Sequence, residues 1–375
     1  MVSEYYNNSK INIYIPEKFR IYIQERPFKE FTGQMLTQYD RVYRHLYRGG
    51  VVLVNGNWEK IKLLYRYIVR KQNDISRGKR SKSNLRFDSD QVNHLLYRFA
   101  LFAQKDTILT EPPQYIPYLF NFVGEIEVES KKDECYYIPL YEFMKIKESL
   151  KKQYNVNALN ERLISHYTVL PPASQKIYTL FRSVLETLQP SIPHELSVLD
   201  MGCGSGVLTF ITVFVLKDRL KTIHVTDILP EALGSCKYNI DQLNEKNTIN
   251  TKKISVLNSG DLFTPVDRKN KYDCILFNPP WTVKSKWSKE NKATSDYEFR
   301  VLNSFLRDAA TFLSTHGIIL LFYSDHSGKD VMDTVEKLIK KYSYIIKSRF
   351  QEKIRAKRKS KKWEKCFIII LNKNI

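Results

Sequence analysis

The fold is decided by the stretch Ser197-Val198-Leu199-Asp200-Met201-Gly202-Cys203-Gly204-Ser205-Gly206. A short apolar run ends at an acidic residue, and three glycines follow at alternate positions before a second apolar run begins. Glycine adopts backbone dihedrals that other residues avoid, and it lets the main chain approach a ligand closely. The order strand, glycine-rich turn, helix is typical of the ligand-binding loop of an open α/β sheet.

Strand and helix patterns alternate around this loop. We expect strands at 197–200, 222–226, 253–257, 272–277, 317–323, 343–350 and 366–371, and helices at 174–188, 206–217, 230–243, 296–314 and 329–341. Strands separated by helices favour a parallel, doubly wound sheet. Only a Lys/Arg-rich loop joins the last two strands, so they are expected to pair as an antiparallel hairpin. The sequence therefore predicts an α/β fold with a doubly wound, mostly parallel, seven-stranded Rossmann-like sheet and an antiparallel edge hairpin.

Acidic side chains stand at the ends of the first three predicted strands. Asp200 would repel a pyrophosphate but suits an ammonium group, which S-adenosylmethionine carries beside its sulfonium; Asp200 would act on that end directly or by holding the loop. Asp227 has the spacing of about 20 residues from the glycine loop that is typical of a ribose-binding acid. Asp261 is placed to accept a hydrogen bond from the adenine amine. The expected cofactor-binding residues are Asp200, Gly202, Cys203, Gly204, Gly206, Asp227, Ile228, Asp261, Leu262 and Asn278.

The fourth predicted strand ends in Asn278-Pro279-Pro280-Trp281. Proline fixes φ and lacks an N–H, and the residue before a proline avoids the α region, so this tetrapeptide should be stiff and extended. It can hold an amide, backbone carbonyls and an indole around a planar group that carries an NH2. We predict that the Asn278 side-chain oxygen and the Pro279 carbonyl accept its hydrogen bonds and that Trp281 stacks on it. The alternative is a Pro-Pro loop after a buried strand, with Trp281 filling the core.

Residues 1–150 do not show this alternation and are expected to form a smaller, basic, mixed α+β domain for substrate recognition or an accessory role. The catalytic domain is expected at 160–375. Within the first half we expect β-type runs at 11–15 and 19–23, helices at 34–48 and 58–71, and a strand at 51–54. An exposed loop is expected at 76–82, and a helix from Asp88 or Ser89 whose apolar stripe includes Phe99 and Phe102.

The chain is strongly basic, with a net charge of +20 from 60 Lys and Arg against 40 Asp and Glu. This balance favours a polyanionic partner, nucleic acid before an anionic membrane surface, although a Lys-rich proteome would produce the same bias. The cations cluster in two places. The expected nucleic-acid contacts are Arg77, Lys79 and Arg80, together with Lys353, Arg355, Lys357, Arg358, Lys359, Lys361 and Lys362 beside Trp363. The alternative for the second cluster is a sheet edge that Lys protects against strand pairing.

The five cysteines are scattered and form no C-x-x-C pair, so we expect reduced thiols and no metal site. The first residues lack the apolar stretch of a signal peptide. The longest apolar run, Val207 to Leu216, is about half of the ~18–20 residues that a membrane-spanning helix needs. The expectation is a cytoplasmic protein without a membrane partner.

Residues 165–375 resemble class I S-adenosylmethionine-dependent methyltransferases. Within that class they are similar to the group with an Asn-Pro-Pro-aromatic signature, the HemK-type glutamine methyltransferases and related RNA methylases. The likeness rests on that signature, on 227–233 and Asn239, on Gly260 to Phe263, and on the proline-bearing segment Tyr167 to Ser174, which in the family covers the cofactor. Trp281 departs from the Tyr that is usual in the glutamine methylases, and residues 1–150 resemble no family that we can name.

Together these features predict an S-adenosylmethionine-dependent N-methyltransferase. The favoured substrate is an exocyclic or ring-attached amino group of a nucleic-acid base, in RNA rather than DNA. One alternative is methylation of a protein glutamine amide, with the basic surface engaging a ribosome-associated or other RNA-bound protein. A second alternative is an S-adenosylmethionine- and RNA-binding module without turnover.

Overall fold

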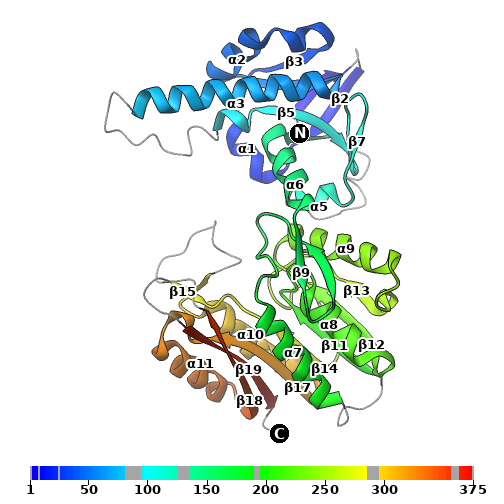
Figure 1. Ribbon diagram of the computed structural model, residues 1–375, viewed down its shortest axis with the longest axis vertical. Coiled ribbons are helices and arrows are strands. Elements are labelled where there is room, and N and C mark those ends of the chain that lie inside the picture. The colour runs from blue at the N-terminus through cyan, green and yellow to red at the C-terminus, as the bar shows by residue number, and fades with distance from the viewer. Residues whose placement is uncertain are drawn as a thin grey trace. The chain divides into compact units, whose positions relative to one another are not determined.

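The structure is a computed structural model that describes residues 2–6, 9–23, 26–80, 94–125, 135–189, 195–284, 295–355 and 363–373. The chain divides into two compact units, Met1–Glu148 and Ser149–Ile375 (Figure 1). Within the described residues, the helices are all too short or too polar to cross a membrane.

The first unit is built on a mixed sheet with the strand order β1-β2-β8-β5-β4-β3. β3, β4 and β5 are parallel, whereas β8 is antiparallel to β5. Its strands are β1 (Val2–Tyr6), β2 (Ser9–Tyr14), β3 (Phe28–Thr32), β4 (Val51–Asn55), β5 (Phe99–Gln104), β6 (Thr107–Ile108), β7 (Gln114–Tyr115) and β8 (Cys135–Pro139). Its helices are α1 (Glu17–Ile23), α2 (Tyr39–Tyr47), α3 (Trp58–Arg80), α5 (Leu119–Phe122) and α6 (Leu140–Lys151), with the 3-10 turn η1 (Gly33–Thr37).

Three local predictions for this unit are wrong. Phe99 and Phe102 lie in strand β5 and not on a helix; residues 81–93 lie outside the described part. Five consecutive residues of β5 are buried, and a continuous apolar run of this kind reads equally well as a buried helix or a buried strand. Residues 19–23 belong to helix α1 rather than to a β-type run. The expected loop at 76–82 is helical as far as Arg80, where α3 ends.

The second unit contains a seven-stranded sheet with the order β13-β12-β11-β14-β17-β19-β18. The first five strands are parallel, and β19 is antiparallel to both of its neighbours. The strands are β11 (Leu196–Met201), β12 (Leu220–Thr226), β13 (Ile254–Val256), β14 (Tyr272–Phe277), β17 (Leu313–Ser324), β18 (Tyr344–Arg355) and β19 (Trp363–Lys373). The helices are α7 (Gln175–Leu188), α8 (Val207–Leu216), α9 (Pro230–Glu245), α10 (Arg300–Phe312) and α11 (Lys329–Lys341). This is the expected α/β, Rossmann-like class.

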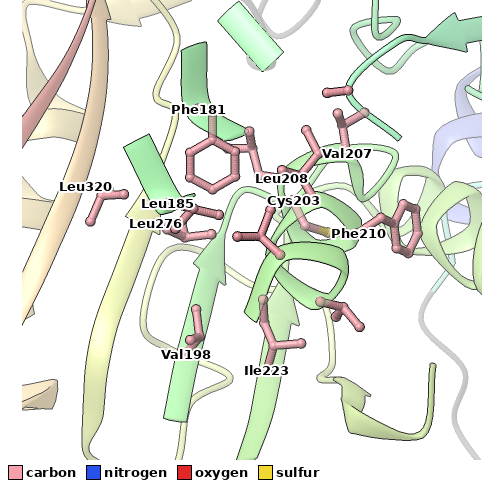
Figure 2. Packing of buried hydrophobic residues seen from close by; sticks show 14 of the residues in the cluster. Phe181, Leu185, Val198, Cys203, Val207, Leu208, Phe210, Ile223, Leu276 and Leu320 are labelled. Carbon is pink, nitrogen blue, oxygen red and sulfur yellow. The ribbon is translucent and has the colours of Figure 1, made fainter. Parts of the chain in front are cut away.

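Helices cover both faces of this sheet. Alternate residues of each strand point to opposite faces, so each strand packs against both helix layers. Val198 of β11 belongs to the apolar cluster on the side of α7, α8 and α9, and Leu199 belongs to the cluster on the side of α10 and α11. Figure 2 shows Phe181 of α7 and Leu208 of α8 packed around the strand residues of the first cluster. Each fully buried large apolar side chain contributes roughly 1.5–3 kcal/mol, so these layers fix the strand ends that carry polar residues.

Two small pairs of strands flank the main sheet. β9 (Gln153–Val156) and β10 (Glu161–Ile164) form an antiparallel hairpin before α7. β15 (Thr282–Lys284), which begins directly after Trp281, pairs in parallel with β16 (Ser295–Tyr297).

The edge hairpin differs from the expectation in its length. β18 continues to Arg355, so Lys353 and Arg355 lie on an edge strand and not in the connecting loop. The strand extends because every residue from Ser348 to Arg355 has a partner in β19. The remaining cations of this cluster, Lys357, Arg358, Lys359, Lys361 and Lys362, lie outside the described residues.

Candidate functional site

A cavity of about 430 Å³ opens at the carboxyl ends of the parallel strands. Ligand pockets for small molecules are commonly about 300–1,000 Å³, and open α/β sheets bind ligands at this edge. Four strand ends contribute to it. The predicted residues that line it are Gly202, Cys203, Gly204, Asp227, Ile228, Asp261, Leu262, Asn278, Pro279 and Pro280.

The glycine loop after β11 forms one wall of the cavity. The N–H groups of Gly202 and Cys203 both donate to the Thr226 carbonyl, at 2.9 and 3.0 Å, which ties the loop to the end of β12. Gly206 has φ +90°, and a Cβ atom there would lie 2.6 Å from the Phe210 ring. Glycine is therefore required at that position by both conformation and space.

Asp227 connects the glycine loop to the start of α9. Its Oδ2 accepts the Gly204 N–H at 2.9 Å, and its Oδ1 accepts the Leu229 N–H at 3.0 Å. Burial raises the pKa of this carboxyl above its ordinary value. Each carboxylate oxygen keeps a further lone pair, so Asp227 can hold the loop and still accept a hydrogen bond from a ribose hydroxyl.

Asp200 lies beneath the loop and is not part of the lining. Its Oδ2 accepts a hydrogen bond from the Thr209 hydroxyl of α8 at 2.5 Å, and burial raises the pKa of its carboxyl to about 7. Its Oδ1 is buried and accepts no hydrogen bond from any described residue, so both roles that the sequence left open, direct contact with the cofactor and loop support, stay predictions.

Asn278 occupies the end of β14, on the cavity lining. Its Oδ1 is buried and accepts no hydrogen bond from any described residue. Buried polar atoms in native proteins nearly always have a partner, so this oxygen is an acceptor that no described residue uses.

Trp281 is not among the lining residues that the structure describes. Its indole is half-buried and packs against the apolar clusters on both sides of the sheet. This is the placement that the alternative interpretation of the tetrapeptide predicted, in which the indole belongs to the core.

The segment before α7 contributes Val169, Leu170 and Pro172 to the lining, where the resemblance implied a cover for the cofactor. Asn239 of α9 holds this region to the glycine loop. Its Nδ2 donates to the carbonyls of Ile164 and Ser205, and its Oδ1 accepts the Ile164 N–H.

Sequence reasoning did not identify a further wall of the cavity, formed by Tyr178 of α7, Ser295 and Tyr297 of β16, and Arg300 and Val301 of α10. β16 has only three residues, which is too short to produce a strand pattern. The helix predicted at 296–314 begins only at Arg300, because residues 295–297 form β16. Asp296 was the available signal for a later helix start, since Asp is a favoured helix-capping residue.

The predicted nucleic-acid contacts are only partly described. Lys353 and Arg355 are exposed on β18, and Arg77, Lys79 and Arg80 lie in the last turns of α3. No group of His, Cys, Asp and Glu that could hold a metal ion occurs among the residues with described positions.

Comparisons with known proteins agree with this geometry. Residues 181–351 match the family model for the methyltransferase small domain. The chain is 35% identical over 103 residues to a ribosomal protein L11 methyltransferase of Lactobacillus gasseri, covering 27% of this chain and 28% of that protein. It is 34% identical over 136 residues to a release factor glutamine methyltransferase of Leptospira interrogans, covering 36% and 44%. A putative protein N5-glutamine methyltransferase of Methanocaldococcus jannaschii is 27% identical over 186 residues, covering 47% and 82%.

The chain thus spans less than half of the length of the first two of these relatives. The cavity suits S-adenosylmethionine, because its volume is that of a small-molecule site, glycines allow close approach of the backbone, and Asn278 offers a buried acceptor at the end of β14. In its fold, its cavity and its match to the family model over residues 181–351, the second unit therefore resembles the class I S-adenosylmethionine-dependent methyltransferases.

Proposed function

We propose that this protein is an S-adenosylmethionine-dependent N-methyltransferase in which Asn278 orients a planar NH2 group for methylation. The observation that carries the proposal is the Asn278 Oδ1, which is buried on the cavity lining with no hydrogen-bond donor among the described residues. An amide or aromatic amine has a delocalised lone pair and is a poor nucleophile. An acceptor for its N–H fixes the direction of that lone pair, which is a positioning effect.

The cofactor would be held by the Gly202–Gly206 loop, by Asp227 at the ribose and by Asp261 and Leu262 at the adenine. Bound there, S-adenosylmethionine supplies a methyl group that its sulfonium already activates. The protein therefore needs no strong general base. Asn278 and the Pro279 carbonyl hold the two N–H bonds of the target, and the apolar lining limits water.

We favour a nucleic-acid base as the substrate because of the cationic end of the edge hairpin. Arg355 pairs with Trp363, and Lys353 pairs with Lys365. Residues directly opposite in an antiparallel pair share a face, so these four side chains form one exposed patch, the hairpin patch, in which Trp363 is 48% exposed. Cations beside an exposed aromatic suit a phosphate backbone with a stacked base.

The hairpin patch lies at the same edge of the sheet as the cavity. Ser324, the last residue of β17, pairs with Cys366 of β19, so the beginning of β19 stands at the carboxyl end of β17. β14, which leads into Asn278, is parallel to β17. A strand of nucleic acid on the patch would thus approach the edge where Asn278 lies.

A second candidate is methylation of a protein glutamine amide. Two of the relatives are named as glutamine methyltransferases. The half-buried Trp281 packs into the core, so it gives no preference for a stacked base over a glutamine amide. Both substrates present a planar NH2 to Asn278.

Labelling tests these proposals. The full-length protein is incubated with methyl-labelled S-adenosylmethionine and cell extract, and label is followed into the RNA, DNA and protein fractions, with Asn278→Ala as the inactive control. We expect label in RNA. Label recovered as N5-methylglutamine would transfer the assignment to the second candidate, and absence of label from every fraction would contradict methyltransferase activity.

The nucleic-acid partner predicts a steep salt dependence. Affinity for single-stranded RNA should fall several-fold or more between about 50 and about 200 mM salt, because neutralised phosphates release counterions. Replacing Lys353 and Arg355 by Gln should weaken binding and flatten the salt slope.

The charge-matched control for that experiment is the double variant Lys221→Gln and Lys269→Gln. Both lysines are exposed near the starts of β12 and β14, at the opposite edge of the sheet. Equal effects of the two double variants would indicate general electrostatic attraction and would remove the hairpin patch from the proposal.

A further inference from the structure

One wall of the cavity carries a cation to which the proposed catalytic and cofactor contacts assign no role. Among the described lining residues, Arg300 is the single Lys, Arg or His, and it shares the cavity with two acids, Asp227 and Asp261. Its guanidinium Cζ lies 4.7 Å from the centre of the Tyr297 ring, which also lines the cavity. No acidic side chain in the described part of the chain forms an ion pair with it.

The Arg300 side chain is exposed, and the backbone that carries it is fixed by a tightly specified turn. Asp296 is fully buried, and its two carboxylate oxygens accept the N–H groups of Val301 and Leu302 at 2.9 and 3.1 Å. Glu298 and Phe299 have φ of +48° and +59°. Two consecutive non-glycine residues in the left-handed region are unfavourable and persist only where the surrounding structure imposes them.

The electrostatics of this corner favour an anion. Arg300 is the first residue of α10, a helix of thirteen residues. A cation at a helix N-terminus adds to the positive end of the helix dipole, which is an unfavourable pairing in the absence of an anion. Asp296 offsets part of this potential, but burial raises the pKa of its carboxyl, which reflects the difficulty of keeping charge there.

The order of the strands gives the direction in which the proposed cofactor contacts run. The sheet runs β13-β12-β11-β14, and the proposed contacts along that order are adenine at Asp261, ribose at Asp227 and then the amino-acid end. That end therefore points toward β14. β15 follows the β14 tetrapeptide directly and pairs with β16, whose Tyr297 supports Arg300.

We propose that Arg300, stacked on Tyr297, binds the carboxylate of the methionyl part of S-adenosylmethionine. Asp227 and Asp261 then face the ribose hydroxyls and the adenine amine, and Arg300, the one cation among the described lining residues, faces the one anionic group of the cofactor. A guanidinium binds a carboxylate through two parallel hydrogen bonds, which is stronger and more directional than an ammonium contact. The inference rests on the proposed function only in taking S-adenosylmethionine as the ligand.

The test compares two ligands that differ in this carboxylate. S-adenosylhomocysteine carries the amino-acid group, and 5′-methylthioadenosine lacks it. Dissociation constants for both are measured by calorimetry with the full-length protein and with Arg300→Gln, Arg300→Lys and the control Arg307→Gln. Arg307 lies on the same helix, is exposed, and is not part of the lining.

We expect Arg300→Gln to weaken S-adenosylhomocysteine by about 10- to 100-fold, the range of one charge-assisted contact, with 5′-methylthioadenosine affinity unchanged. Arg300→Lys should restore part of the loss, and Arg307→Gln should have no effect. Unchanged S-adenosylhomocysteine affinity in Arg300→Gln, or an equal loss for both ligands, would overturn the inference. Failure of the wild-type protein to bind either ligand would instead contradict the proposed function.

Discussion

Asn278 and Asp227 both line the cavity, yet they should fail in different ways when replaced. Asn278 contributes an acceptor that no described residue uses, so Asn278→Ala should lower kcat by about 100-fold or more through loss of alignment and leave S-adenosylhomocysteine affinity nearly unchanged. Asp227→Ala should lower that affinity and release the Gly204 and Leu229 N–H groups. Single-turnover kinetics and calorimetry separate the two effects; near-normal turnover in Asn278→Ala would contradict its assigned role.

The Asp200 carboxyl should make stability depend on pH. Its pKa is raised from 3.8 to about 7 by burial, so proton binding favours the folded state. That contribution is complete below about pH 4 and is lost as pH rises through 7. Asp200→Asn is neutral at every pH and can still accept from Thr209.

We compare the free energy of unfolding of Asp200→Asn with that of the wild type, both without cofactor. The difference should favour the variant by about 2–3 kcal/mol more at pH 8 than at pH 5. Urea unfolding at both pH values measures the difference. The prediction fails if the offset between the two proteins is the same at both.

At the scale of elements, the glycine loop and helix α8 are joined by close packing at Gly206. A Cβ atom there would lie 2.6 Å from the Phe210 ring and 2.9 Å from the Cys236 Sγ, at φ +90°. At Gly202, with φ +72°, an added Cβ would meet no atom within 4 Å.

Gly206→Ala should thus destabilise the protein by about 2–4 kcal/mol, from overpacking and backbone strain together. Gly202→Ala, the matched control, carries only the strain of about 1–2 kcal/mol. Denaturant unfolding of the two variants ranks them. Equal losses would indicate that the region around Phe210 relaxes freely.

The sequence predicted some helices and strands with the right bounds and misassigned others. β14 and α11 have the predicted bounds, 272–277 and 329–341, because polar residues bound each apolar pattern clearly. Phe99 was misassigned because burial on both faces of β5 removes the alternation that distinguishes a strand. Local pattern carries no information on which neighbouring strand or helix buries such a run.

The same limit applies to the site. Asp227 and Asn278 were predictable because a polar residue at the end of a parallel strand faces a known edge of the sheet. Arg300 was not, since its position depends on the pairing of two three-residue strands that are separated in sequence. The burial of Trp281 depends on its packing against both apolar clusters, and the spacing of residues along the chain does not predict that packing.

At the scale of the whole molecule, the two units have different expected roles, and a truncation tests them. All described residues that line the cavity belong to the second unit. A chain of residues 152–375, cut where α6 ends, should bind S-adenosylhomocysteine with affinity close to that of the full chain, measured by calorimetry.

The same truncated chain should transfer at least about 10-fold less methyl label to its macromolecular substrate, because we expect residues 1–150 to add to the substrate binding that the hairpin patch provides. Retained transfer would assign recognition to the second unit, including the hairpin patch. Loss of cofactor binding would show that the second unit needs the first in order to fold.

The position of β19 between β17 and β18 also bears on how the protein is made. Translation produces β18 before β19, yet β18 has no place in the sheet until β19 has paired with β17. Until residues 363–373 leave the ribosome, β17 keeps an unpaired, apolar edge, the kind of edge that promotes aggregation. The second unit should therefore complete its sheet late in translation, and a chain that ends before Trp363 should be retained by chaperones or degraded even though it contains every described residue of the cavity lining.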